Sequence, residues 1–180
     1  MRDLEMRGAG NLLGANQSGH ICNIGFDLYC QLLRRTIAQL QGKTPPPLMD
    51  VAVRIDFLNL SPASDDTTNG AFIPYDYIED ENLRLRLYQR LSALAEKKEI
   101  TLIQQEIKDR FGPLPPPVQR LLLIAQLRIH AAAHNINAIT VRDNQVMLNT
   151  PNGYRTQSGQ HPHLEDGNPT QRLKALIKLI

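Results

Sequence analysis

The 180-residue sequence predicts an α+β fold, in which an N-terminal helical hairpin precedes a small mixed domain with a short sheet and three to four helices. Apolar residues recur at spacings of three and four in several stretches, as Leu83, Leu87 and Leu91 do, which is typical of helices with one buried face. Val51, Val53 and Ile55 alternate with polar or small residues, which indicates a strand. Proline-rich stretches separate these patterns and divide the chain.

The first part of the chain, residues 1–43, is predicted to form the helical hairpin. Its second half carries an apolar stripe at helical spacing, made by Phe26, Tyr29, Leu33, Ile37 and Leu40. Gly42 is a typical helix end, and the prolines at 45–47 cannot continue a helix. We therefore expect a linker at 44–50 and a second domain at 51–180.

The second domain is expected to open with a strand whose buried face runs from Val51 to Phe57. A polar loop and a short extended segment, AFIPYDYI, follow it. Helices are predicted from Asp80, at about 99–110 and at about 117–134, then a hairpin at 138–148 turning at Asp143 and Asn144. Glycine, proline and polar residues predict a flexible loop at 150–168, and 170–180 fits a closing helix.

The composition indicates a globular protein that is not strongly basic. Hydrophobic residues make up 42% of the chain, and 20 basic and 18 acidic residues give a net charge of +2 without an obvious basic patch. No apolar run approaches the roughly 20 residues that span a bilayer, and the first residues are charged. We expect a cytoplasmic protein without membrane contact, whose Cys22 and Cys30 are reduced and structural.

Several catalytic and ligand-binding motifs are missing or incomplete in the sequence. It has no GxxxxGK[ST] phosphate loop and no GxSxG nucleophile elbow, and GAGNLLG lacks the preceding strand and downstream acid of a dinucleotide site. His130 and His134, like His161 and His163, have spacings that metal sites use, but surface or half-buried histidines are the simpler interpretation. We predict no catalytic residues and no metal site.

The stretch MRDLEMRGAGNLLGANQSGH is not explained by composition. Gly8, Gly10 and Gly14 permit a tight backbone near Arg7, whose guanidinium is suited to fixed bidentate contacts between moving parts. The alternative is a simple helical brace in which Arg7 pairs with Asp3 or Glu5. Further along, Arg34, Arg35 and Lys43 are possible DNA contacts, although cations near a helix C-terminus are also favoured by the helix dipole.

The string RDLEMRGAGNLLGANQSG resembles the translocation motif that bacterial transcription-repair coupling factors share with the RecG branch-migration helicase. The later strings GFDLYCQLL, FIPYDYIEDENLRLRLYQRL and DRFGPLPPPVQRLL are similar to the C-terminal part of the coupling factors. The resemblance implies that Arg7 and Gln17 link ATP hydrolysis to movement along DNA. It also implies that Arg2, Asp3 and Glu5 hold the hairpin against the motor.

The function implied by this resemblance is that of the C-terminal part of an ATP-dependent DNA translocase. Such a protein displaces stalled RNA polymerase and recruits UvrA in transcription-coupled excision repair. The chain would contact the motor domains of the same protein. It would also bind the UvrA-recognition region, and this contact would keep the protein inactive. Duplex DNA and RNA polymerase would be bound through the parent protein.

ATP and magnesium belong to the motor domains, so we expect no cofactor and no ATPase activity in this chain. Met1 matches an internal position of the family, which implies a designed fragment or a truncated reading frame. The alternative function is an accessory duplex-DNA-binding module of a RecG-like helicase.

Overall fold

The computed structural model describes residues 51–60 and 68–180, which form an α+β domain and confirm the predicted fold class. The described part contains four helices and one four-stranded mixed sheet. In chain order the elements are β1 (Ala52–Ile55), α3 (Glu81–Ala93), α4 (Lys97–Phe111), α5 (Pro116–Ala133), β2 (Ala138–Arg142), β3 (Gln145–Thr150), β4 (Gly153–Arg155) and α6 (Pro169–Leu179). None of these helices is long and apolar enough to cross a bilayer.

The sheet has the order β1-β2-β3-β4 and joins distant parts of the chain. β1 pairs with β2 in parallel, with Ala52 opposite Ala138 and Ile55 opposite Val141. The other neighbours are antiparallel, and β2 and β3 are joined by a two-residue turn. Asp143 and Asn144 both have positive φ, at 48° and 66°, as this type of tight hairpin turn requires. The predicted hairpin and its turn are therefore confirmed.

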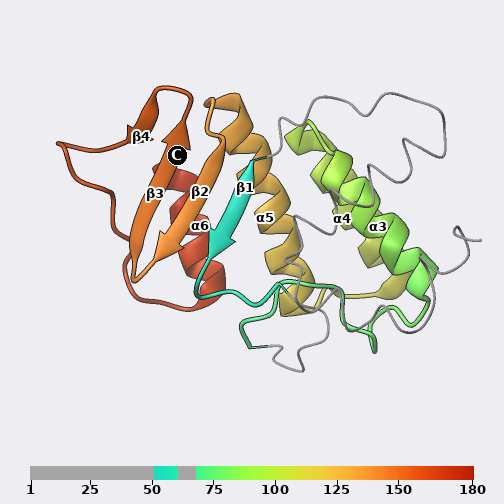
Figure 1. Cartoon of the computed structure of the whole chain (residues 1–180). Helices are drawn as coiled ribbons and strands as arrows, with labels where there is room; N and C mark the ends of the chain where they lie inside the picture. Colours follow the sequence, from blue (N-terminus) through green and yellow to red (C-terminus); the bar gives the residue numbers. More distant parts are fainter. Residues whose placement is uncertain (1–50, 61–67) are drawn as a thin grey trace, which may run out of the picture.

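Two hydrophobic cores lie on opposite sides of α5 (Figure 1). In the first, one face of the sheet packs against α5 and α6; its most buried members include Leu127, Ile139 and Leu173. In the second, α3 and α4 pack against α5 through residues such as Leu87, Ile107 and Leu121. α5 contributes to both cores, which explains why its sequence is apolar almost all round.

The helices begin and end where local chemistry directs them. Asp80 caps α3 by accepting a hydrogen bond from the Leu83 amide at 3.1 Å. α4 ends at Gly112, whose φ is +85°, and α5 begins directly after Pro115 with two further prolines in its first turn. α6 begins with a reciprocal cap in which Asn168 and Gln171 bond each other's backbone amides.

The segment AFIPYDYI, expected to be extended, forms turns with no strand. The Pro74 carbonyl accepts hydrogen bonds from the Tyr77 and Ile78 amides, which folds the chain back on itself. The Ile73 amide donates to the Tyr88 hydroxyl on α3 at 2.8 Å. Ile73 and Ile78 are buried in the helical core, whereas Tyr75 is 70% exposed. The sequence pattern alone does not distinguish such a buried turn segment from a strand.

β1 is also shorter than the alternating pattern predicts, since it ends at Ile55. Phe57 lies in a turn and is half-buried, and the Arg172 guanidinium of α6 lies 3.8 Å from the centre of its ring. This cation–π contact binds the end of β1 to α6.

Residues 150–168, expected to form an irregular flexible loop, contain β4 and further backbone pairing. β4 pairs with β3 through a tight turn in which Thr150 Oγ1 donates to the Gly153 carbonyl at 2.8 Å. Further along, the Pro162 carbonyl accepts from the Val146 amide, and Leu164 is buried in the sheet core. Glycines and prolines here form turns around β4, a short strand that the sequence did not predict.

Candidate functional site

The residues predicted to couple the motor to translocation lie outside the described part of the structure. The same holds for the possible DNA contacts and for both cysteines. These residues are Arg2, Asp3, Glu5, Arg7, Gly8, Gly10, Gly14, Gln17, Cys22, Cys30, Arg34, Arg35 and Lys43. Their roles stay predictions, and the geometry of the 51–60 and 68–180 segments has to be considered on its own.

His130 and His134 lie together at the C-terminal end of α5. Their ring centres are 4.5 Å apart, and His134 Nδ1 donates to the His130 carbonyl at 2.9 Å. Burial lowers the pKa of His130, and the nearby His134 and Lys97 lower it further. Within residues 51–60 and 68–180, no third histidine, cysteine or carboxylate joins them to form a metal-binding group.

His161 and His163 lie beside the sheet and are separated by the buried Pro162. The His161 ring meets Tyr154 of β4 edge-on, with ring centres 5.6 Å apart and planes at 89°. His163 is exposed, and its backbone bridges to Gln145 at the start of β3. The two histidines therefore flank the outer part of the sheet and do not converge on one point.

The sheet has a second face, which is turned away from α5 and α6 and is called here the open face. Its residues follow from the strand register, because they alternate with the buried core residues. They form three rows across the strands: Ala52, Ala138, Asn149 and Tyr154; Arg54, Thr140 and Met147; and Asp56, Arg142, Gln145 and His163.

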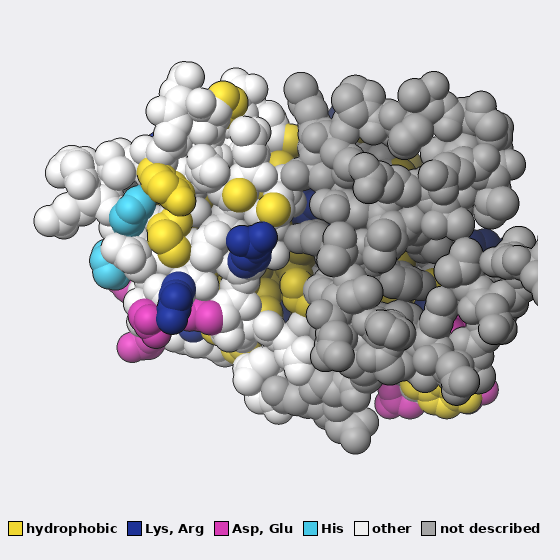
Figure 2. Space-filling model, viewed as in Figure 1, with side chains coloured by type: hydrophobic (Ala, Val, Ile, Leu, Met, Phe, Trp, Pro, Cys, Tyr) yellow, Lys and Arg dark blue, Asp and Glu magenta, His cyan; other side chains and the backbone are white. Residues whose placement is uncertain are grey.

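The open face carries charges of both signs and is partly apolar. Arg54 is exposed and the Arg142 side chain is 80% exposed, while Ala52, Ala138, Thr140 and Met147 are half-buried. Two carboxylates lie near Arg142: Asp56 occupies the next position of the β1–β2 register, and Asp143 Oδ2 is 3.9 Å from the Arg142 guanidinium. Figure 2 shows basic, acidic, histidine and hydrophobic side chains on this side of the sheet.

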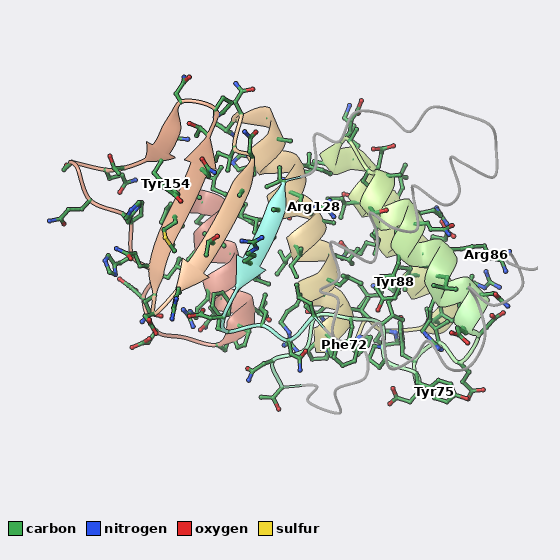
Figure 3. All side chains as sticks on the ribbon, in the orientation of Figure 1. Phe72, Tyr75, Arg86, Tyr88, Arg128 and Tyr154 are labelled. Carbon is green, nitrogen blue, oxygen red and sulfur yellow. The ribbon has the colours of Figure 1, made fainter. Side chains whose placement is uncertain are left out.

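Tyr154 stands at the outer edge of the open face, at the opposite end of the molecule from Tyr75 and Arg86 (Figure 3). Its side chain is 61% exposed. The open face was not found from the sequence, although its signal was present. Arg54, Thr140 and Met147 occupy the positions that alternate with the buried residues, and the pairing of β2 with β1 and with β3 brings them into one row.

An ion pair joins α3 and α4 on the other side of the molecule. Arg90 donates two hydrogen bonds of 2.7 Å to the Glu106 carboxylate. The hydrogen bond from Arg90 lowers the pKa of Glu106 and raises that of Arg90. Both side chains are about half exposed, at 48% and 47%, so the pair orients the two helices more than it stabilises them.

Comparison with known proteins assigns the chain to a family. The family model of the TRCF domain matches residues 68–160, just over half of the chain, which include α3, α4, α5 and the antiparallel part of the sheet. The chain belongs to the transcription-repair coupling factor family. The predicted family is thereby confirmed.

Curated members of the family are similar along most of the chain. The transcription-repair-coupling factor of Mycobacterium tuberculosis is 37% identical over 149 residues, which are 78% of this chain and 11% of the relative. That of Bacillus subtilis is 35% identical over 151 residues, covering 82% and 12%. That of Myxococcus xanthus is 39% identical over 127 residues, covering 71% and 10%. The chain thus spans about a tenth of the length of these coupling factors.

Among solved structures, the crystal structure of the C-terminal domain of a transcription-repair coupling factor resembles this one. The TM-score is 0.46 at 18% identity, and the match covers 61% of this chain and 59% of that one.

Proposed function

We propose that this chain is the C-terminal, regulatory part of a transcription-repair coupling factor and acts through protein contacts. The observation that carries the proposal is the TRCF-domain match at residues 68–160, which falls on the folded α+β domain. The parent protein would be an ATP-dependent DNA translocase. It would displace stalled RNA polymerase and recruit UvrA in transcription-coupled excision repair.

In this proposal the segment before the described domain couples the motor to movement on DNA. Arg7 and Gln17 would link ATP hydrolysis to movement along DNA, and Arg2, Asp3 and Glu5 would hold the hairpin against the motor. ATP and magnesium would be bound by motor domains elsewhere in the parent. The purified chain should therefore show no ATP hydrolysis with or without duplex DNA, and DNA-stimulated hydrolysis would contradict the proposal.

The α+β domain would regulate the parent by binding its UvrA-recognition region in the resting state. A mixed surface of the kind seen on the open face suits such a contact, because protein interfaces combine apolar area with arginine and aromatic residues. The contact would open when the protein engages polymerase.

Calorimetry of the purified chain with the UvrA-recognition region of the same organism's coupling factor tests this regulatory role. Binding that changes little between low and moderate salt is the expected result. The rival function, duplex-DNA contact through Arg34, Arg35 and Lys43, predicts DNA binding that weakens by about one log-log slope unit per phosphate neutralised. Steeply salt-dependent DNA binding without protein binding would replace the proposal.

A further inference from the structure

We infer that His130 and His134, at the C-terminal end of α5, form a chelating site for a divalent metal ion of the Ni²⁺ or Cu²⁺ class. Such a site is independent of the regulatory role proposed above. The sequence led us to expect no metal site, because a spacing of four residues does not distinguish a chelating pair from two surface histidines. The structure adds the distance between the rings, the tautomer of His134 and the surroundings of His130.

The two rings lie side by side because the end of α5 is a regular helix. Residues four apart project from the same side of a helix, and α5 is helical up to Ala133, with His134 as its cap residue. The ring centres are 4.5 Å apart, and the ring planes are inclined at 61°. His130 is half-buried and His134 is exposed, so an ion reaches the pair from the solvent.

The distance between the rings fits an ion that holds its ligands at right angles. A histidine nitrogen binds a metal at about 2.0–2.1 Å, which places the ion about 3.2 Å from the centre of the ring. Two rings on one ion would have centres about 4.5 Å apart at a right angle, and about 5.2 Å apart at the tetrahedral angle. The distance in this structure, 4.5 Å, is the right-angle value. Ni²⁺ and Cu²⁺ favour this geometry with nitrogen ligands, whereas Zn²⁺ favours the tetrahedron.

A hydrogen bond fixes the tautomer of His134. Its Nδ1 lies 2.9 Å from the His130 carbonyl oxygen. A carbonyl oxygen can only accept, so Nδ1 carries the proton and the lone pair of the neutral ring lies on Nε2. Metal-binding histidines are oriented in the same way, because a backbone carbonyl often holds the ring nitrogen that does not bind the metal.

His130 is kept in the form that binds a metal. Burial lowers its pKa, and His134 and Lys97 lower it further, so the neutral ring with its free lone pair predominates at neutral pH. The C-terminal end of a helix carries a partial negative charge, which attracts a cation. Lys97 would repel the ion, but its side chain is exposed and the repulsion is screened by water and salt.

A phosphate ion is the less favoured ligand of this pair. It would need both imidazoles in the charged form beside Lys97, and the surroundings of His130 disfavour that form. Within residues 51–60 and 68–180, no third histidine, cysteine or carboxylate joins the pair, so water would take the other coordination positions of the metal. The expected affinity is that of a chelate with two ligands.

Calorimetry with NiCl₂ on the full chain, produced without a histidine tag, tests the site. We expect H130Q and H134Q each to weaken Ni²⁺ binding about tenfold or more, because a single imidazole then replaces the chelate. His134 is exposed, so H134Q leaves the core intact, and an unchanged amide spectrum confirms the fold of both variants. Cys22 and Cys30 are the same in all of these proteins, so their thiols do not contribute to the difference.

The matched control is H161Q/H163Q, which removes two histidines that do not converge and should bind Ni²⁺ as the wild type does. In the isotope-labelled chain, Ni²⁺ should first broaden or shift the amide signals at the end of α5 and around Lys97. Binding that survives both H130Q and H134Q, or an equal loss in the control, would assign the ion to other ligands and overturn the inference. Tighter binding of Zn²⁺ than of Ni²⁺ would overturn the right-angle geometry, and binding of inorganic phosphate in place of Ni²⁺ would refute the metal site.

Discussion

Arg120 shows how one residue links the two halves of the domain. It lies on α5 and is only 4% exposed, and its Nε donates to the Gly70 carbonyl at 2.6 Å. Gly70 in turn bridges to Asn59, just after β1. A buried arginine is uncommon unless its donors are used, so this bond fixes the path of the chain between β1 and the apolar segment that follows.

Replacing Arg120 with methionine tests this role. The R120M variant leaves the Gly70 carbonyl without its donor, and an unsatisfied buried acceptor costs about 1–3 kcal/mol. Urea unfolding of both proteins would measure the loss. The exposed Arg142 is the control, because R142M should change the free energy of unfolding by no more than about 0.5 kcal/mol. Equal values for the two variants would contradict the role of Arg120.

His130 makes the stability depend on pH. Its pKa in the folded protein is lowered, first by burial and then by His134 and Lys97, so folding favours the neutral ring. The neutral ring stabilises the fold above the ordinary histidine pKa of about 6.5. That stability is lost as the pH falls, because the unfolded chain takes up the proton first.

The expected result is a free energy of unfolding that falls between about pH 7 and pH 5, and a smaller fall in H130Q. Denaturant titrations at several pH values provide the measurement. H163Q, which removes an exposed histidine far from the end of α5, is measured alongside for comparison. If the free energy of unfolding of H130Q fell with pH as steeply as that of the wild type, groups other than His130 would cause the pH dependence.

At the scale of the elements, apolar packing holds α3 and α4 together, and the ion pair between Arg90 and Glu106 helps to set the orientation of one helix against the other. The bidentate geometry is good, but both side chains are half exposed and water screens the pair. A double-mutant cycle with R90A, E106A and the double variant should give a coupling energy of about 0.2–1 kcal/mol.

This coupling should disappear in acid. Arg90 lowers the pKa of Glu106, so the pair stabilises the fold above the ordinary glutamate pKa and ceases to do so as the pH falls through the lowered value. A cycle that gives the same coupling energy in strong acid would show that the contact between the side chains is not ionic.

Features that depend on neighbouring residues, such as helix ends, were predicted from the sequence better than features that depend on contacts between distant parts of the chain. The end of α4 near Gly112 and the start of α5 after Pro115 were predicted closely. A glycine with positive φ ends a helix, and prolines, which lack an amide donor, begin one, so both signals are read from the residues at the boundary itself. β4 was missed because three exposed residues give no apolar alternation. The segment around Pro74 was misjudged because its burial depends on α3 and α5. The open face needed the pairing of Ala52 with Ala138, which no local pattern specifies.

At the scale of the whole molecule, α5 makes two cores into one cooperative unit. Leu121 belongs to the helical core and Leu127 to the sheet core, and both are essentially inaccessible to solvent. L121A and L127A should each lower the free energy of unfolding by about 2–5 kcal/mol.

Each variant should also lower the midpoint for both halves together, as followed by amide signals of α4 and of β2 in urea. A variant that unfolds one half at a lower midpoint than the other would show that α5 does not couple the cores. Leu102, which is 70% exposed on α4, supplies the control, because L102A removes the same atoms without opening a core.

The parallel pairing of β1 with β2 has a consequence for biosynthesis. More than eighty residues separate Ala52 from its partner Ala138, and all of α3, α4 and α5 lie between them. At ribosomal rates of about 5–20 residues per second, β1 emerges roughly 4 to 17 s before β2 exists. The residues of the helical core all precede β2. On the ribosome, the residues of the helical core are therefore all synthesised before the sheet can form.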